Sequence, residues 1–264
     1  MHFRGNRFRV KLSGLALIAL GACLAWPLPG WAKDKDKDKD KDKDKKAPAA
    51  DVDSGSFGVY SAGHRVATET FSIKPRPEGT VVSSEFKSEQ GEQKAAQSSE
   101  LDLTPSVDLQ RYSWKELLPE QFEAVVEPSD TFLVEHFGPP GELPKDQSFL
   151  LPASTTILDD YFFVQREILA WKYLATSCPI DKNGGRGCPL SQKVHFGTLN
   201  PHARSSMGVS VEFTGQEKLT LHSGDCQCNR FVLGSENGDW TFWLDEKFKL
   251  VRLVSDTGIE VLRD

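Results

Sequence analysis

Apolar and polar residues alternate with a period of two over most of residues 56–264. This is the period of a β-strand that turns one face toward a core and the other toward solvent. Turn-forming residues separate the runs, as at Ser235–Asp239, where an Asn-Gly step favours a tight hairpin. The alternating runs are 58–62, 65–74, 80–88, 94–103, 108–117, 122–126, 131–136, 193–198, 206–214, 218–222, 230–235, 241–244 and 250–255. The pattern predicts a domain built mainly from antiparallel hairpins.

One segment breaks the alternation. Between Thr155 and Ala175, apolar residues recur at spacings of three and four, which is typical of an α-helix. Ser154 or Thr155 would cap this helix, and Asp159 and Asp160 would lie near its positive end. The helix would be apolar on nearly all sides and therefore buried. We expect a mainly β (α+β) fold, a curved antiparallel half-barrel or β-spiral wrapped around one central helix.

Residues 1–32 have the order of a secretory signal peptide. Basic residues precede the apolar run 12–24, and small residues stand at Gly30 and Ala32. The apolar run is shorter than the ~20 residues of a spanning helix. Cleavage after Ala32 would deliver the chain to the periplasm. The alternative is a lipoprotein, because Leu20-Gly21-Ala22-Cys23 resembles a lipobox in which Cys23 would carry the lipid anchor.

Residues 33–55 are expected to form a disordered linker. Lys and Asp alternate strictly from 33 to 45, which places like charges four residues apart in a helix and leaves a strand no apolar face. Residues 56–264 would then form a single β-rich envelope domain. The net charge of −6, without a basic and aromatic patch, argues against nucleic acid as a partner.

Three groups of short motifs carry a resemblance to a known class of proteins. They are Gly58-Val59-Tyr60 with Gly63-His64-Arg65 and Glu69-Thr70-Phe71, then Leu151-Pro152 with Leu158-Asp159-Asp160, and Trp243-Leu244-Asp245 with Leu250-Val251-Arg252. Residues 56–264 thereby resemble uncharacterised exported β-spiral proteins, which are loosely similar to the half-barrels of the lipoprotein-localisation factors. The resemblance implies a curved sheet that encloses an apolar cavity. It does not establish a function.

The mature chain would keep four cysteines, Cys178, Cys188, Cys226 and Cys228. An even number in an exported protein favours disulfides, and four cysteines allow three pairings. A bond between Cys178 and Cys188 would close a short Gly-rich loop. A bond between Cys226 and Cys228 would close a very tight ring, so crossed pairing stays open.

Motifs for catalysis, metal binding or cofactor binding are weak, and we expect no catalytic, metal or cofactor site. His195, His202 and His222 lie in the same half of the chain as the cysteines, but without the paired spacing of zinc sites. Ser84 and Lys87 match a Ser-x-x-Lys pattern in a predicted strand, where residues three apart point to opposite faces.

Aromatic residues are the remaining candidates for a binding site. Tyr161, Phe162, Trp171, Trp240 and Trp243 would line an apolar pocket between the sheet and the helix. The leading hypothesis is therefore a non-enzymatic envelope protein that binds a lipid, an acyl group or a lipoprotein or other envelope partner. The alternative is a scaffold or protein-interaction domain with a filled core. A hydrolase or a thiol redox enzyme is a third hypothesis, which the weak motifs disfavour.

Overall fold

The structure is a computed structural model that describes residues 51–264 except 90–93, 181, 183–185 and 222–223. The predicted signal peptide, Cys23 and most of the predicted linker lie outside the described residues, and so does His222. The first strand begins at Asp53, so the folded domain starts three residues earlier than the predicted boundary.

The described residues form fifteen strands and one helix. The elements are β1 (Asp53–Ser61), β2 (His64–Arg76), β3 (Gly79–Ser88), β4 (Ala96–Leu103), β5 (Leu109–Leu118), β6 (Phe122–Ser129), β7 (Phe132–Gly138), β8 (Lys145–Phe149), β9 (Thr156–Ile157), α1 (Val164–Ser177), β10 (Lys193–Asn200), β11 (Ser205–Leu221), β12 (Gly224–Ser235), β13 (Gly238–Leu244), β14 (Leu250–Ser255) and β15 (Ile259–Arg263). The mainly β fold predicted from the alternating pattern is confirmed.

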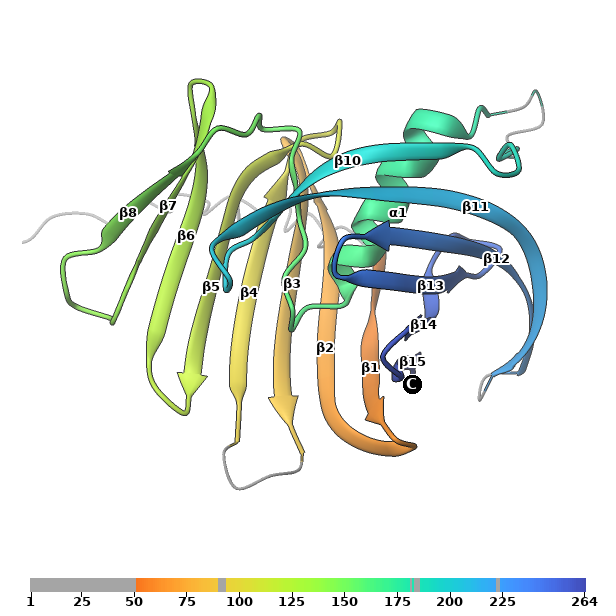
Figure 1. Ribbon diagram of the computed structural model, residues 1–264, viewed down its shortest axis with the longest axis horizontal. Helices are drawn as coiled ribbons and strands as arrows, with labels where there is room; N and C mark the ends of the chain where they lie inside the picture. Colours follow the sequence, from red (N-terminus) through yellow and green to blue (C-terminus); the bar gives the residue numbers. More distant parts are fainter. Residues whose placement is uncertain (1–50, 90–93, 181, 183–185, 222–223) are drawn as a thin grey trace, which may run out of the picture. The chain divides into compact units, whose positions relative to one another are not determined.

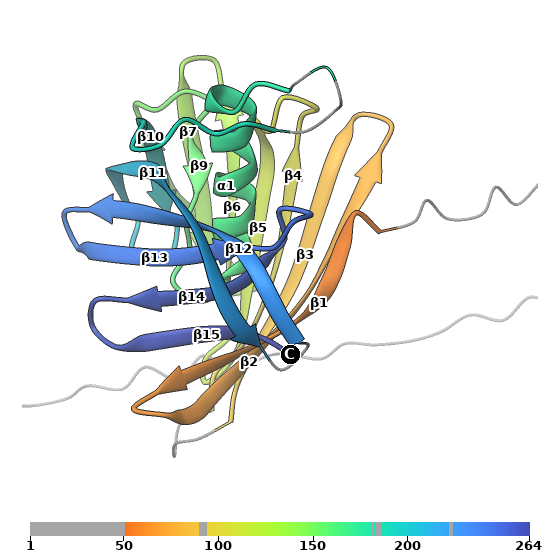
Figure 2. The same cartoon turned by 90° about the vertical axis from the view of Figure 1, so that its right-hand side faces the viewer.

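All fifteen strands belong to one open, curved sheet (Figures 1 and 2). Its order is β8-β7-β6-β5-β4-β3-β2-β1-β15-β14-β13-β12-β11-β10-β9. Strand β1 pairs with β15, which joins the two ends of the domain, for example at Val59 and Val261. Every neighbouring pair is antiparallel except β9 with β10.

The helix begins nine residues later than predicted. Thr156 and Ile157 pair with β10 as strand β9. The Asp159 carboxylate then accepts a hydrogen bond from the backbone of Tyr161, which holds the next residues in an irregular turn. Asp159 and Asp160 consequently precede the helix instead of lying in its first turns, and no side chain of the preceding residue caps it.

One face of the sheet, here called the inner face, carries the main apolar core together with α1. Ten of the fourteen residues of α1 are buried. The helix bonds to distant strands: Glu167 accepts from the backbone of Leu250 in β14, and Tyr173 accepts from the backbone of Phe213 in β11. Within the described residues, no helix combines the length and apolar character that a membrane crossing requires.

The opposite face, here called the outer face, carries a smaller apolar cluster of Leu219, Cys228, Trp243 and Val251. Leu219 belongs to the distal half of the β11–β12 hairpin, beyond a bulge between Phe213 and Gly215. Gly215 has a φ of 126°, a left-handed backbone conformation that favours glycine. Beyond this bulge, the hairpin contributes to the core of the outer face instead of the inner one.

Candidate functional site

The structure does not bring the five predicted pocket aromatics together. Phe162 is fully buried, and Tyr161, Trp171 and Trp240 are partly buried against the main core. Trp243 lies on the outer face, in the smaller cluster. Trp240 and Trp243 are three residues apart on β13, so they point to opposite faces of the sheet. The prediction of one pocket lined by all five is therefore wrong.

A buried carboxylate from β2 replaces the predicted caps of α1. The Glu69 side chain is fully buried, with Oε2 2.7 Å from the backbone nitrogen of Phe163 and Oε1 3.3 Å from that of Val164. Ser84 donates its hydroxyl to Oε1 at 2.6 Å. Burial raises the pKa of Glu69 to about 7, although these hydrogen bonds oppose the shift.

A second buried polar group joins β5 to the β10–β11 turn through Asp159. Its Oδ2 atom lies 2.9 Å from the Tyr112 hydroxyl and 2.7 Å from Nδ1 of His202. The Trp114 ring stacks on the His202 ring with 3.7 Å between centroids. Burial, and then the charge of Asp159, raises the pKa of Tyr112 well above its usual value, which keeps the hydroxyl protonated as a donor.

Glu135 of β7 lies on the inner face near this group. It is fully buried, and neither carboxylate oxygen has a hydrogen-bond partner within the described residues. Burial raises its pKa to about 7; the charge of Asp159 adds to the shift and that of Arg204 opposes it. An unpaired buried carboxylate is costly when ionised, so protonation near neutral pH is the physical way to relieve that cost.

Asp159 and His202 have the geometry of two members of a nucleophile-activating triad. In such a triad, the other ring nitrogen of the histidine accepts the proton of a serine, threonine or cysteine. Nε2 of His202 is buried and has no such partner within the described residues. The contact between Asp159 and His202 therefore tethers the β10–β11 turn to the segment that precedes α1.

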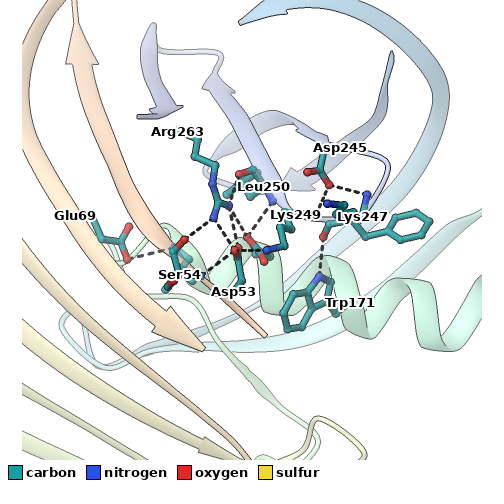
Figure 3. Close-up of polar contacts among 12 residues, drawn as sticks. Asp53, Ser54, Glu69, Trp171, Asp245, Lys247, Lys249, Leu250 and Arg263 are labelled. Carbon is teal, nitrogen blue, oxygen red and sulfur yellow. Dashed lines mark hydrogen bonds and ion pairs between the residues drawn. The ribbon is translucent and has the colours of Figure 1, made fainter. Parts of the chain in front are cut away.

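A third buried group links both ends of the domain to the helix (Figure 3). Asp53 of β1 accepts hydrogen bonds from Arg263 at 2.6 and 2.9 Å and from Lys249 at 2.8 Å. Glu167 of α1 lies beside it, with Oε2 3.9 Å from Nη1 of Arg263. Burial, and then the charge of Asp53, raises the pKa of Glu167, so Glu167 holds a proton beside an ionised Asp53.

A groove of about 510 Å³ crosses the outer face between the distal β11–β12 hairpin and strands β14 and β15. Its volume lies within the range of about 300–1,000 Å³ that is usual for ligand sites. The residues that line it are Lys218, Leu219, Thr220, Leu221, Arg252, Glu260, Leu262 and Arg263. Of the five predicted aromatics, only Trp243 belongs to the cluster that shares Leu219 and Leu221 with this groove.

Strand register explains why these side chains meet. Trp243 lies directly opposite Arg252, and Arg252 lies directly opposite Leu262, so the three follow one line across the outer face. The Arg252 guanidinium lies 5.0 Å from the centre of a Trp243 ring. The Trp243 indole nitrogen donates to Glu217 of β11 at 2.9 Å, which ties the hairpin to the sheet.

The four cysteines form two pairs at disulfide-bonding distance. Cys178 is paired with Cys188, with their Cα atoms 4.3 Å apart. Cys226 is paired with Cys228, with their Cα atoms 5.3 Å apart. The pairing left open by the sequence is thus the local one. Within the described residues, no group of three or more His, Cys, Asp or Glu side chains is arranged to hold a metal ion.

Sequence reasoning missed the buried carboxylates, although a signal for two of them exists. Glu69 shares the inward face of β2 with Phe71 and Ile73, and Glu135 lies two residues beyond the buried Leu133 of β7. A carboxylate at a core position of an alternating strand is a marker of a buried polar contact. The groove had no comparable signal, because distant strands build it.

Comparisons with known proteins support the fold alone. No family model matches the sequence, and no curated protein matches it significantly. A solved structure, described as a beta-barrel-like protein of domain of unknown function DUF1849 from Brucella abortus, matches with a TM-score of 0.50 and 9% sequence identity. The match covers 80% of this chain and 94% of that chain. The chain is thus similar in fold to an uncharacterised β-barrel-like protein.

Proposed function

We propose that this chain is a non-enzymatic protein of the cell envelope whose folded domain binds an apolar or acylated ligand in the outer groove. The observation that carries the proposal is the groove itself, whose apolar wall comes from Leu219, Leu221 and Leu262. Leu262 is partly exposed on the outer side of β15. An apolar chain placed along these residues would lose contact with water, which is the main source of affinity for such ligands.

The inner face is a poorer candidate for the same ligand. Large side chains that are fully buried occupy it, among them Tyr112, Tyr173, Phe231 and Phe242. We also propose that α1 is the central element around which the sheet curves. A ligand on the outer face would separate this chain in function from the lipoprotein-localisation factors, whose enclosed apolar cavity the sequence resemblance suggested.

The envelope location in this proposal rests on predicted export. The signal-peptide pattern of residues 1–32 predicts it, and two cysteine pairs at bonding distance suit an oxidising compartment. The lipoprotein alternative, with an anchor on Cys23, would place the same domain at a membrane surface.

A second candidate is a protein-interaction domain with a filled core. It is favoured by two exposed leucines, Leu143 at 94% and Leu150 at 78%, which flank the edge strand β8. These leucines lie just outside the two ends of β8, and neither of them lines the groove. Substitutions at the two places therefore separate the two functions.

Titration of the purified protein with the neutral apolar probe N-phenylnaphthylamine tests the proposal. We expect probe fluorescence to rise on binding, and Leu262→Glu to weaken the affinity about tenfold, because a carboxylate would enter the apolar wall. The matched control is Leu143→Glu, which places the same charge on an exposed leucine elsewhere. Equal weakening by both variants, or by neither, would exclude the groove as the binding site.

A further inference from the structure

We infer that the outer groove is selective for an anionic amphiphile, a single acyl chain with a negatively charged head group. This inference rests on the proposed function and adds the class of ligand. The groove carries three cationic side chains, Lys218, Arg252 and Arg263, against one acidic side chain, Glu260. Because Asp53 neutralises Arg263, the other three side chains carry a formal charge of +1, in a chain whose net charge is −6.

Three different strands supply the cationic residues of the groove. Lys218 comes from the distal part of β11, Arg252 from β14 and Arg263 from β15. Arg263 directs its guanidinium to Asp53, to the carbonyl of Ser54 and to the carbonyl of Leu250, so Asp53 balances its charge and few of its donors are free. The other two cations are the ones that can bind a head group directly.

Arg252 and Lys218 keep donors for a ligand although both have acidic partners. Arg252 uses Nε and Nη2 for Glu260, at 2.9 and 2.8 Å, and Nη1 has no partner within the described residues. Lys218 is 68% exposed and contacts Asp225 at 2.7 Å, which occupies one of the three ammonium protons. Each of these side chains can therefore donate a hydrogen bond to an anion without breaking its own ion pair.

Polar and apolar parts of the groove match the two parts of an amphiphile. Leu262 pairs directly with Arg252 across β14 and β15, so an apolar wall and a guanidinium adjoin. Leu219 and Leu221 alternate with Thr220 next to Lys218 on the hairpin. Carboxylate and phosphate head groups share the chemistry that these donors recognise, a compact anion with several acceptor oxygens.

Competition with N-phenylnaphthylamine tests the inference. The competitors share one chain length and differ in the head group: dodecanoate, dodecyl phosphate, dodecanol and dodecyltrimethylammonium. We expect the two anions to displace the probe at a concentration about tenfold lower than dodecanol, and the cation to be the weakest. Inorganic phosphate alone should displace nothing, because it lacks the chain that fills the apolar part of the groove.

Two variants assign the effect to the named side chains. Lys218→Gln and Arg252→Gln should each weaken dodecanoate binding about fivefold, and leave dodecanol binding unchanged. Lys87→Gln is the matched control, because Lys87 is also 68% exposed and paired with an acid, Glu85, away from the groove. Melting curves show whether the change at Arg252 destabilises the fold. Lys218 is exposed, so its replacement should leave stability unchanged.

The outcomes separate the two proposals. Binding of dodecanol as tight as that of dodecanoate overturns anion selectivity and leaves the proposed apolar site intact. Displacement of the probe by inorganic phosphate overturns the amphiphile and leaves a simple anion site. No binding of the probe or of any competitor overturns both the inference and the proposed function.

Discussion

Glu69 of β2 lies at the N-terminus of α1, with Oε2 2.7 Å from the backbone nitrogen of Phe163. This contact joins residues 94 positions apart in the chain and gives the first turn of the helix an acceptor that its own sequence does not supply. Burial makes the acceptor expensive to ionise and raises its pKa to about 7.

The raised pKa predicts how Glu69 affects stability. The folded state binds the proton more tightly than the unfolded state, so this contribution is full below pH 4.5 and is lost as the pH rises toward 7. Glu69→Gln removes the titration. From pH 5 to pH 8, the unfolding free energy of the variant should therefore rise relative to wild type by on the order of 3 kcal/mol.

Urea unfolding at a series of pH values measures this difference. The control is Glu85→Gln on β3, where the glutamate is 62% exposed and pairs with Lys87. It should show no such trend. A pH dependence that is identical in wild type and Glu69→Gln would mean that Glu69 is ionised throughout the range.

Arg263 is predicted to be the residue on which the junction between β1 and β15 depends. It neutralises Asp53 and lies 3.9 Å from Glu167, and both carboxyl groups are almost inaccessible. Arg263→Gln should lower the unfolding free energy by about 3–5 kcal/mol, because it leaves a buried charge with Lys249 as its remaining cation.

A double-mutant cycle with Asp53→Asn and Arg263→Gln checks that reason. The double variant should be less destabilised than the sum of the two single variants, because it removes both charges together. Additive losses would show that Arg263 acts through packing against Phe57 and Phe71 instead, over whose rings its guanidinium also lies.

Sequence alone located most strands because their inner side chains alternate regularly. It missed β8 (Lys145–Phe149), in which only Phe149 is buried, β9, which has two residues, and β15, which has five. It divided β11 in two, because Gly215 and the following polar residues interrupt the pattern at the bulge. Short, exposed or bulged strands form because neighbouring strands pair with them. Those partners can be distant in the sequence, so a local residue pattern does not reveal such strands.

The helix and the site depended even more on distant residues. Apolar residues between Ile157 and Phe163 continued the helical spacing in the sequence. In the structure, the pairing of β9 with β10 and the contacts of Asp159 hold this segment in a non-helical conformation. Likewise, Trp243 was expected beside Trp171 because both are large and aromatic. The two lie on different faces, which follows from the register of β13 in the sheet.

Both cysteine pairs should be oxidised in the exported protein. Alkylation without reductant, followed by mass spectrometry, should label none of the four thiols. Replacing Cys178 and Cys188 by alanine should lower the unfolding free energy by ~2–3 kcal/mol, from the loop of ten residues that the bond closes. The same change at Cys226 and Cys228, two residues apart, should cost less. Stoichiometric labelling of Cys226 and Cys228 would contradict the local pairing.

The mature chain is predicted to start at Lys33. Gly30 and Ala32 supply the small residues that signal peptidase requires, after an apolar run that the prolines at 27 and 29 interrupt. N-terminal sequencing of the protein extracted from the envelope measures the start directly. A blocked N-terminus at Cys23 that carries acyl chains would replace this prediction by the lipoprotein alternative.

Trp171 tests the proposal that α1 is the central element of the fold. Its side chain packs partly buried against the main core, and its indole nitrogen donates to the carbonyl of Phe248 at 2.8 Å. Trp171→Ala should lower the unfolding free energy by about 3 kcal/mol, through lost burial and an unpaired carbonyl. Trp171→Phe is the matched control, because it keeps most of the ring and should cost only about 1 kcal/mol. Urea unfolding of both variants gives the two values. A Trp171→Ala protein that unfolds like wild type would place α1 at the periphery of the fold, and the proposal of a central helix would fail.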